Sequence, residues 1–108
     1  MHGSVMSKSK LIEQLKRKRF LSIGRAGMDL YAEPPGTEFE QANNFSAHVG
    51  GSAANIAVAL AKLGSEVELV TCFSDDAVGR FTAKKLQEFG VGTSHCRIVG
   101  GEARNTLA

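Results

Sequence analysis

Tryptophan is absent from this 108-residue chain, and proline and cysteine occur only twice each. Cys72 and Cys96 lie far apart without metal-ligand spacing, so the sequence predicts reduced core residues instead of a disulfide or a metal site. No apolar run approaches the ~20 residues that a membrane-spanning helix needs. The N-terminus also has no secretory hydrophobic region, which makes a cytoplasmic location the expectation.

A strong excess of one charge is also lacking, since the formal net charge is +2. That value is too small to indicate nucleic acid or an anionic membrane as a partner. The basic cluster at 16–19 ends a helix predicted over Ser7–Arg19, and we interpret it as a solvated helix end, because no aromatic residues interleave with it. Residues 1–4 resemble a cloning remnant, so residues 1–19 are assigned as tag remnant and N-terminal basic helix.

A glycine pair followed by an alanine-rich run is the most informative stretch of the chain. Gly50-Gly51 precedes a helix predicted over Ala53–Leu63, whose faces are nearly all apolar, so we expect it to be buried. A helix that begins after bare glycines presents its free N–H groups to a polar ligand, and Asn55 in its first turn can both donate and accept. A tight strand-to-helix turn without any ligand is the alternative.

Asp29 is the first candidate side chain for such a ligand. Residues 20–24 form an apolar run that predicts a buried strand, and Asp29 is expected just beyond its carboxyl end, where open α/β sheets bind ligands. A turn or cap aspartate is the alternative. The segment 24–29 lacks the G-x-G-x-x-G spacing, which disfavours NAD.

Residues 31–49 contain turn signals and a strand pattern in place of a helix pattern. The Pro-Pro-Gly at 34–36 excludes regular structure, and Asn43-Asn44 indicates a turn. Alternation of Phe45, Ala47 and Val49 with polar residues then predicts a half-buried strand. His48 is expected to be a surface residue, because the sequence shows no carboxylate partner for it.

The second half of the chain continues as strand, helix, strand. A strand is predicted at 66–72, a helix capped by Ser74 or Asp75 and ended by Gly90, a strand at 94–99 and the start of another at 104–108. Alternating strands and helices predict an α/β fold with a mainly parallel sheet. The apolar run at the C-terminus has no terminator, so we expect the front part of a larger domain.

The glycine stretch closely resembles the N-terminal signature of the PfkB, or ribokinase-like, family of carbohydrate kinases. The matching positions are Gly50, Gly51, Ala53, Asn55, Ala57 and Gly64, and the block at 74–81 resembles the family's next motif. The family usually has a glycine where this chain has Ser74. The resemblance extends from about Phe20 to the end, so 20–108 is assigned to the N-terminal part of a ribokinase-like kinase domain.

The resemblance implies a sheet with helices on both faces and a small β lid at 31–49 over a sugar site. It implies that Asp29, Gly50, Gly51 and Asn55 bind the substrate, with Asp29 holding sugar hydroxyls. In the family the catalytic base and anion hole belong to a Gly-Ala-Gly-Asp segment that this chain lacks. The base is therefore expected beyond Ala108, ATP and Mg2+ are expected only in the complete enzyme, and the chain alone is expected to be inactive.

The substrate remains open at the sequence level. Ser74 and its neighbours fit a subgroup that phosphorylates a sugar acid in inositol breakdown, while fructokinase, ribokinase and 2-keto-3-deoxygluconate kinase remain alternatives. Two alternative functions also remain open. The first is a non-catalytic module that forms a homodimer through the lid, and the second is a generic nucleotide-binding domain.

Overall fold

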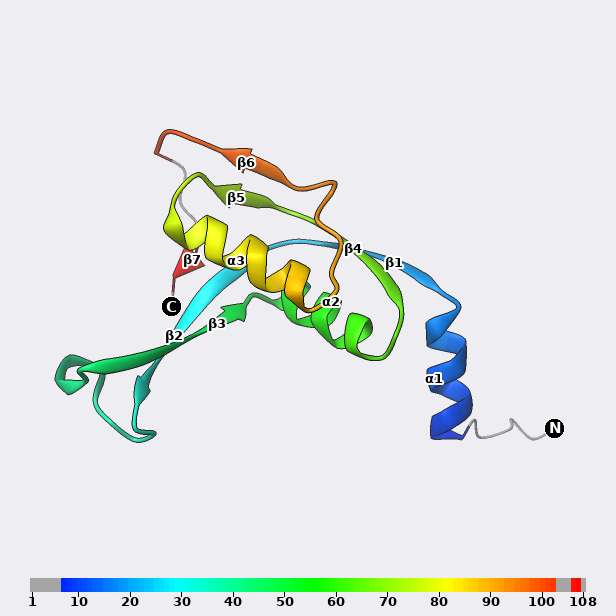
Figure 1. Cartoon of the computed structure of the whole chain (residues 1–108), viewed down its shortest axis with the longest axis horizontal. Coiled ribbons are helices and arrows are strands. Elements are labelled where there is room, and N and C mark those ends of the chain that lie inside the picture. Colours follow the sequence, from blue (N-terminus) through cyan, green and yellow to red (C-terminus); the bar gives the residue numbers. More distant parts are fainter. Residues whose placement is uncertain (1–6, 103–105, 108) are drawn as a thin grey trace.

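The N-terminal helix lies at one side of the molecule (Figure 1), where the carbonyl of Leu15 accepts from the hydroxyl of Ser65 at 2.7 Å. The computed structural model describes residues 7–102, 106 and 107, so the tag assigned to 1–4 lies outside the described residues. Helix α1 (Lys8–Lys16) begins after Ser7, whose hydroxyl accepts from the N–H of Lys10, and it buries no residue (Figure 1). It is shorter than predicted, because Arg19 already pairs with Glu66 as the first residue of strand β1 (Arg19–Ile23).

Parallel pairs of strands form the centre of the fold. Strand β1 pairs with β4 (Glu66–Val70), and helix α2 (Ser52–Lys62) lies between them in the sequence. After Thr71 the chain continues as β5 (Cys72–Ser74), which pairs with β6 (Arg97–Val99). The single strand predicted at 66–72 is thus two short strands with different partners, and the strand predicted at 94–99 is limited to its last three residues. The α/β class with parallel pairing is confirmed.

An antiparallel hairpin extends away from this centre (Figure 1). It consists of β2 (Gly27–Glu33) and β3 (Asn44–Gly50), joined by a loop that contains the short 3-10 helix η1 (Phe39–Gln41). The β structure therefore begins four residues before the predicted start at Tyr31, because Gly27 already pairs with Gly50. Strand β7 (Thr106–Leu107) pairs in parallel with the start of β2. The remaining residues of the strand predicted at 104–108 lie outside the described residues.

Helix α3 (Ala77–Glu88) is capped by Asp76 and not by Ser74 or Asp75 as predicted. The Asp76 carboxylate accepts from the N–H of Gly79 at 2.9 Å and from the hydroxyl of Ser74 at 2.6 Å. Helices α2 and α3 pack on β4 and β5, around a core whose buried apolar residues are Ala26, Ala53, Ala54, Ala57, Val67, Leu69, Phe73, Leu86 and Val91.

Two expectations about burial are wrong. Helix α2 is not enclosed on all sides, because Ile56 is 57% exposed on the side away from the strands. Cys72 is exposed, because its neighbour Phe73 occupies the side of β5 that faces the core; Cys96 is half-buried, and burial raises the pKa of its thiol. The side of β1 away from the helices is also open, with Leu21 60% and Ile23 71% exposed.

Candidate functional site

A pocket of about 500 Å3 lies where four elements meet. These are the end of β1, the start of β2, the end of β3 and the start of α2. We call it the junction pocket, and its lining consists of Ile23, Gly24, Arg25, Ala26, Gly27, Asp29, Gly50, Gly51, Ser52 and Ala53. Strand β3 contributes only Gly50 to the lining, whereas β1, β2 and α2 also contribute side chains.

The start of α2 is held against the turn after β1. Gly51, the residue before the helix, has a φ of +97°, and a Cβ there would lie only 2.5 Å from the carbonyl oxygen of Arg25. From β1, the hydroxyl of Ser22 donates to the carbonyl oxygen of Ala53 at 2.9 Å. A larger residue at position 51 cannot maintain this approach, which explains the glycine.

Asp29 lies within β2, two residues after its start, and not just beyond the end of β1 as predicted. The turn 24–26 is so short that the hairpin has already begun. Asp29 is half-buried, and its carboxylate occupies the space into which any Cβ at Gly50 would project. Glycine at position 50 therefore leaves room for the carboxylate inside the pocket.

The junction pocket combines hydrogen-bond acceptors with donors. No side chain caps the N-terminus of α2, so the N–H groups of its first turn have no side-chain partner there. These N–H groups and the positive end of the helix dipole lie at the same pocket as the carboxylate of Asp29. A ligand with several hydroxyl groups can donate to the carboxylate and accept from the helix.

Three of the four predicted site residues line this pocket: Asp29, Gly50 and Gly51. Asn55 does not, because its side chain is exposed one turn along α2, where its backbone N–H donates to the carbonyl oxygen of Gly51 at 2.9 Å. Sequence reasoning did not assign a binding role to Arg25, which lines the pocket and takes part in no ion pair among the described residues. The sequence signal that could have indicated this role is a single basic residue in a turn between Gly24 and Gly27.

A second pocket, of about 400 Å3, lies on the hairpin. His48 lines it and is exposed, as predicted, and its ring is linked to a carboxylate only through the hydroxyl of Ser46. Its Nε2 lies 3.1 Å from the hydroxyl oxygen of Ser46, and that hydroxyl donates to Glu33 at 2.9 Å. The link was not evident in the sequence, because it crosses from β3 to β2 through a serine.

The described residues contain neither a cluster of metal-ligating side chains nor a membrane-spanning helix. Within residues 7–102, 106 and 107, no group of three or more His, Cys, Asp or Glu side chains could hold a metal ion. In the same part of the chain, no helix has the length and hydropathy required to span a bilayer.

Comparisons with known proteins agree on one family. The profile of the pfkB family carbohydrate kinases matches residues 17–108. A 5-dehydro-2-deoxygluconokinase of Photobacterium profundum is 40% identical over 86 residues, which cover 80% of this chain and 26% of that protein. The chain thus spans about a quarter of the length of the curated relatives it matches.

Two solved structures have a similar fold over most of this chain. A fructokinase of Xylella fastidiosa with bound ATP is 33% identical, with a TM-score of 0.72 over 84% of this chain and 28% of that one. An aminoimidazole riboside kinase of Salmonella enterica, complexed with aminoimidazole riboside and an ATP analog, is 29% identical, with a TM-score of 0.70 over 83% of this chain and 28% of that one.

Proposed function

The chain belongs to the pfkB family of carbohydrate kinases, and from this membership we propose that it forms the sugar-binding part of an ATP-dependent kinase. The kinase transfers a phosphoryl group to a hydroxyl of a sugar or sugar acid. The observation that carries the proposal is the carboxylate of Asp29, held over Gly50 in a pocket at the start of α2.

Each part of the junction pocket has a role in this proposal. The carboxylate of Asp29 accepts hydrogen bonds from neighbouring sugar hydroxyls, and hydrogen bonds to a charged acceptor contribute about 1.5–3 kcal/mol each. Gly50 and Gly51 allow the substrate to approach the backbone, and no capping side chain competes for the N–H donors at the start of α2. Asn55 lies outside the pocket lining, exposed one turn along α2, and is proposed to contact a substrate that extends beyond the pocket.

The reacting groups are proposed to belong to the remainder of the full-length kinase. Among the described residues no group of three or more His, Cys, Asp or Glu side chains could hold a metal ion, and the sequence contains neither a Gly-Ala-Gly-Asp segment nor a P-loop. We derive no step of phosphoryl transfer through the residues described for this chain. They bind and orient the sugar.

We propose 5-dehydro-2-deoxygluconate as the substrate. Two relatives with that kinase name, from Photobacterium profundum and Shouchella clausii, are 40% and 43% identical to the chain. Arg25 provides physical support, because a guanidinium without an ion pair can bind a carboxylate through two parallel hydrogen bonds. Fructose and ribose, which have no carboxylate, would not use this contact.

Replacing Asp29 by asparagine tests the proposal. In the full-length kinase, Asp29→Asn removes the charge and converts one acceptor into a donor, so we expect kcat/KM for the sugar to fall about ten- to hundredfold. The KM for ATP should change little. Asp75→Asn is the matched control, since Asp75 is exposed and, among the described residues, forms its one ion pair with Arg80, at 3.6 Å. Unchanged sugar kinetics in Asp29→Asn would remove this residue from the site.

Replacing Arg25 by glutamine tests the substrate class. Loss of a charged contact to a carboxylate predicts a KM at least tenfold higher for the sugar acid and an unchanged KM for a neutral sugar that the enzyme accepts. Arg17→Gln, at the exposed end of α1, serves as the control. An equal rise for acid and neutral sugars would show that Arg25 does not recognise a carboxylate.

The alternative function is dimerisation through the hairpin without catalysis. One side of the hairpin carries Leu30 and Ala47, and Phe45 beside them is 40% exposed and packs against Phe39. This alternative predicts a dimer in sedimentation experiments and no sugar-dependent production of ADP. A homodimer through this side is also compatible with kinase activity, so the activity assay decides between the two.

A further inference from the structure

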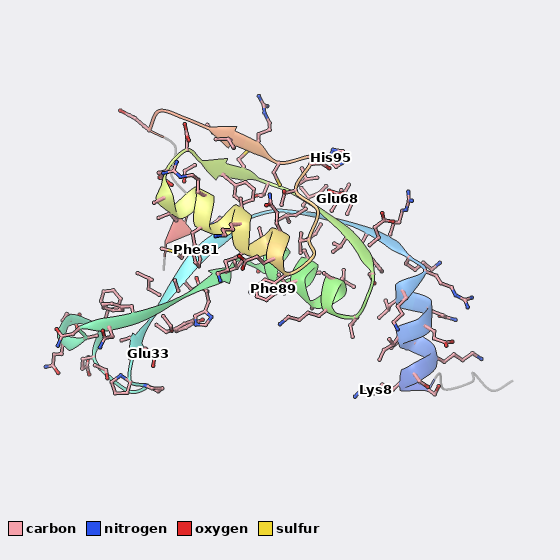
Figure 2. All side chains as sticks on the ribbon, viewed as in Figure 1. Lys8, Glu33, Glu68, Phe81, Phe89 and His95 are labelled. Atoms are coloured by element: carbon pink, nitrogen blue, oxygen red, sulfur yellow. The ribbon has the colours of Figure 1, made fainter. Side chains whose placement is uncertain are left out.

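The two pockets open on the same side of the hairpin. In the antiparallel register Asp29 lies opposite His48, and Tyr31 lies opposite Ser46. Because side chains alternate along a strand, these four residues and Glu33 share one side of the ladder. Glu33 marks the far end of this polar strip, away from the helices (Figure 2). The strip begins at the junction pocket and ends in the second pocket, here called the hairpin pocket.

The hydrogen bonds in the hairpin pocket determine which nitrogen of His48 carries the proton. The hydroxyl of Ser46 donates its one proton to Oε1 of Glu33, at 2.9 Å. Its oxygen can then only accept from Nε2 of His48, at 3.1 Å. In the neutral imidazole, Nε2 is therefore the donor, and Nδ1 is left as an acceptor.

The orientation of the ring is held from a second side. The ring of Tyr31 packs edge-on against His48 with 5.1 Å between centroids. Ser46 and Tyr31 together position the imidazole on the strip that also carries Asp29. Cross-strand neighbours have Cβ atoms roughly 4.5–5.5 Å apart, so one sugar can contact both Asp29 and His48.

We propose that the hairpin pocket is a second subsite for the same substrate, in which Nδ1 of His48 accepts a hydrogen bond from a hydroxyl of the polyhydroxy chain bound at Asp29. This inference rests on the proposed function. A nitrogen acceptor beside a carboxylate fits a hydroxyl and disfavours a carboxylate. A sugar acid would accordingly place its hydroxyl-bearing end towards His48 and its carboxylate towards Arg25. His48 is then a specificity-determining residue.

The decisive experiment compares His48→Phe with His95→Gln in the full-length kinase. Phenylalanine keeps a ring against Tyr31 but removes the acceptor, so we expect the sugar KM to rise about three- to tenfold with the KM for ATP unchanged. His95 is an exposed histidine before β6, far from the hairpin (Figure 2), and its replacement should change neither value.

A second measurement does not depend on turnover. In protein labelled with 15N-histidine, the chemical shifts of His48 should show the tautomer with hydrogen on Nε2. Ser46→Ala should lose this preference and produce a mixture, and binding of the sugar to the wild-type protein should shift the Nδ1 signal. A wild-type His48 with hydrogen on Nδ1 would overturn the arrangement.

The outcomes separate the two proposals. An active wild-type kinase with a raised sugar KM in His48→Phe, at unchanged thermal stability, supports the subsite. An active wild-type kinase with unchanged sugar kinetics in His48→Phe overturns the subsite and leaves the proposed function intact. A wild-type protein that phosphorylates neither sugar acids nor neutral sugars overturns the proposed function, and the subsite with it.

Discussion

The junction pocket and the far end of the hairpin share two local structural features, but their surroundings differ. Each has a glycine with positive φ, Gly51 at +97° and Gly36 at +90°. Each also has a hydroxyl that donates to a backbone carbonyl, from Ser22 in the junction and from Thr37 in the hairpin loop. At the junction pocket these features are enclosed by packed backbone, whereas in the hairpin loop they face open space. The same substitution should therefore have different consequences in the two places.

The largest difference is expected for alanine at the two glycines. Both variants place a Cβ where φ is positive, at a cost of about 1–3 kcal/mol. Gly51→Ala adds an overlap with the carbonyl oxygen of Arg25, while a Cβ at Gly36 would have no atom within 4 Å. Overpacking against backbone costs about 1–3 kcal/mol. We expect Gly51→Ala to lower the free energy of unfolding by about 2 kcal/mol more than Gly36→Ala, as measured by urea denaturation.

Sugar binding provides a second measure of the difference between Gly51→Ala and Gly36→Ala. Movement of α2 away from Arg25 in Gly51→Ala would displace the N–H groups at the junction pocket, so binding of the sugar should be lost. Gly36→Ala changes only the lining of the hairpin pocket and should weaken binding much less. Equal losses of stability in the two variants would mean that the backbone yields at little cost. The contact between Gly51 and Arg25 would then not be the reason for the glycine.

The sequence predicted the junction better than the hairpin for a physical reason. The glycine pair and the alanine-rich helix are local signals, and three of the four predicted site residues line the pocket. The bounds of the hairpin depend on pairing between residues far apart in sequence. Leu30 and Tyr31 are adjacent large residues that obscure the alternation of β2, so the sequence placed Asp29 before the strand instead of within it.

Contacts through a third residue and burial by distant elements were also not predictable. The link from His48 to Glu33 depends on the register of β2 with β3 and on the hydroxyl of Ser46 between them. A helix that is apolar on nearly all faces does not reveal which of those faces is covered. Ile56 and Cys72 are exposed because the strands and helices described for this chain cover only one side of each element.

The smallest difference is expected when one hydroxyl is deleted from each region. Ser22→Ala removes the half-buried donor to Ala53, a residue only 8% exposed, so the carbonyl loses a partner that water cannot easily replace. We expect this to cost about 1 kcal/mol of unfolding free energy. Thr37→Val removes the exposed donor to Pro34, where water takes its place, and should stay within about 0.5 kcal/mol of the wild type. Urea midpoints at equal m-values measure both. Equal losses of unfolding free energy in the two variants would indicate that water reaches the carbonyl of Ala53. The junction pocket would then be more open than its packing indicates. In that case the sugar KM of Ser22→Ala should also remain unchanged.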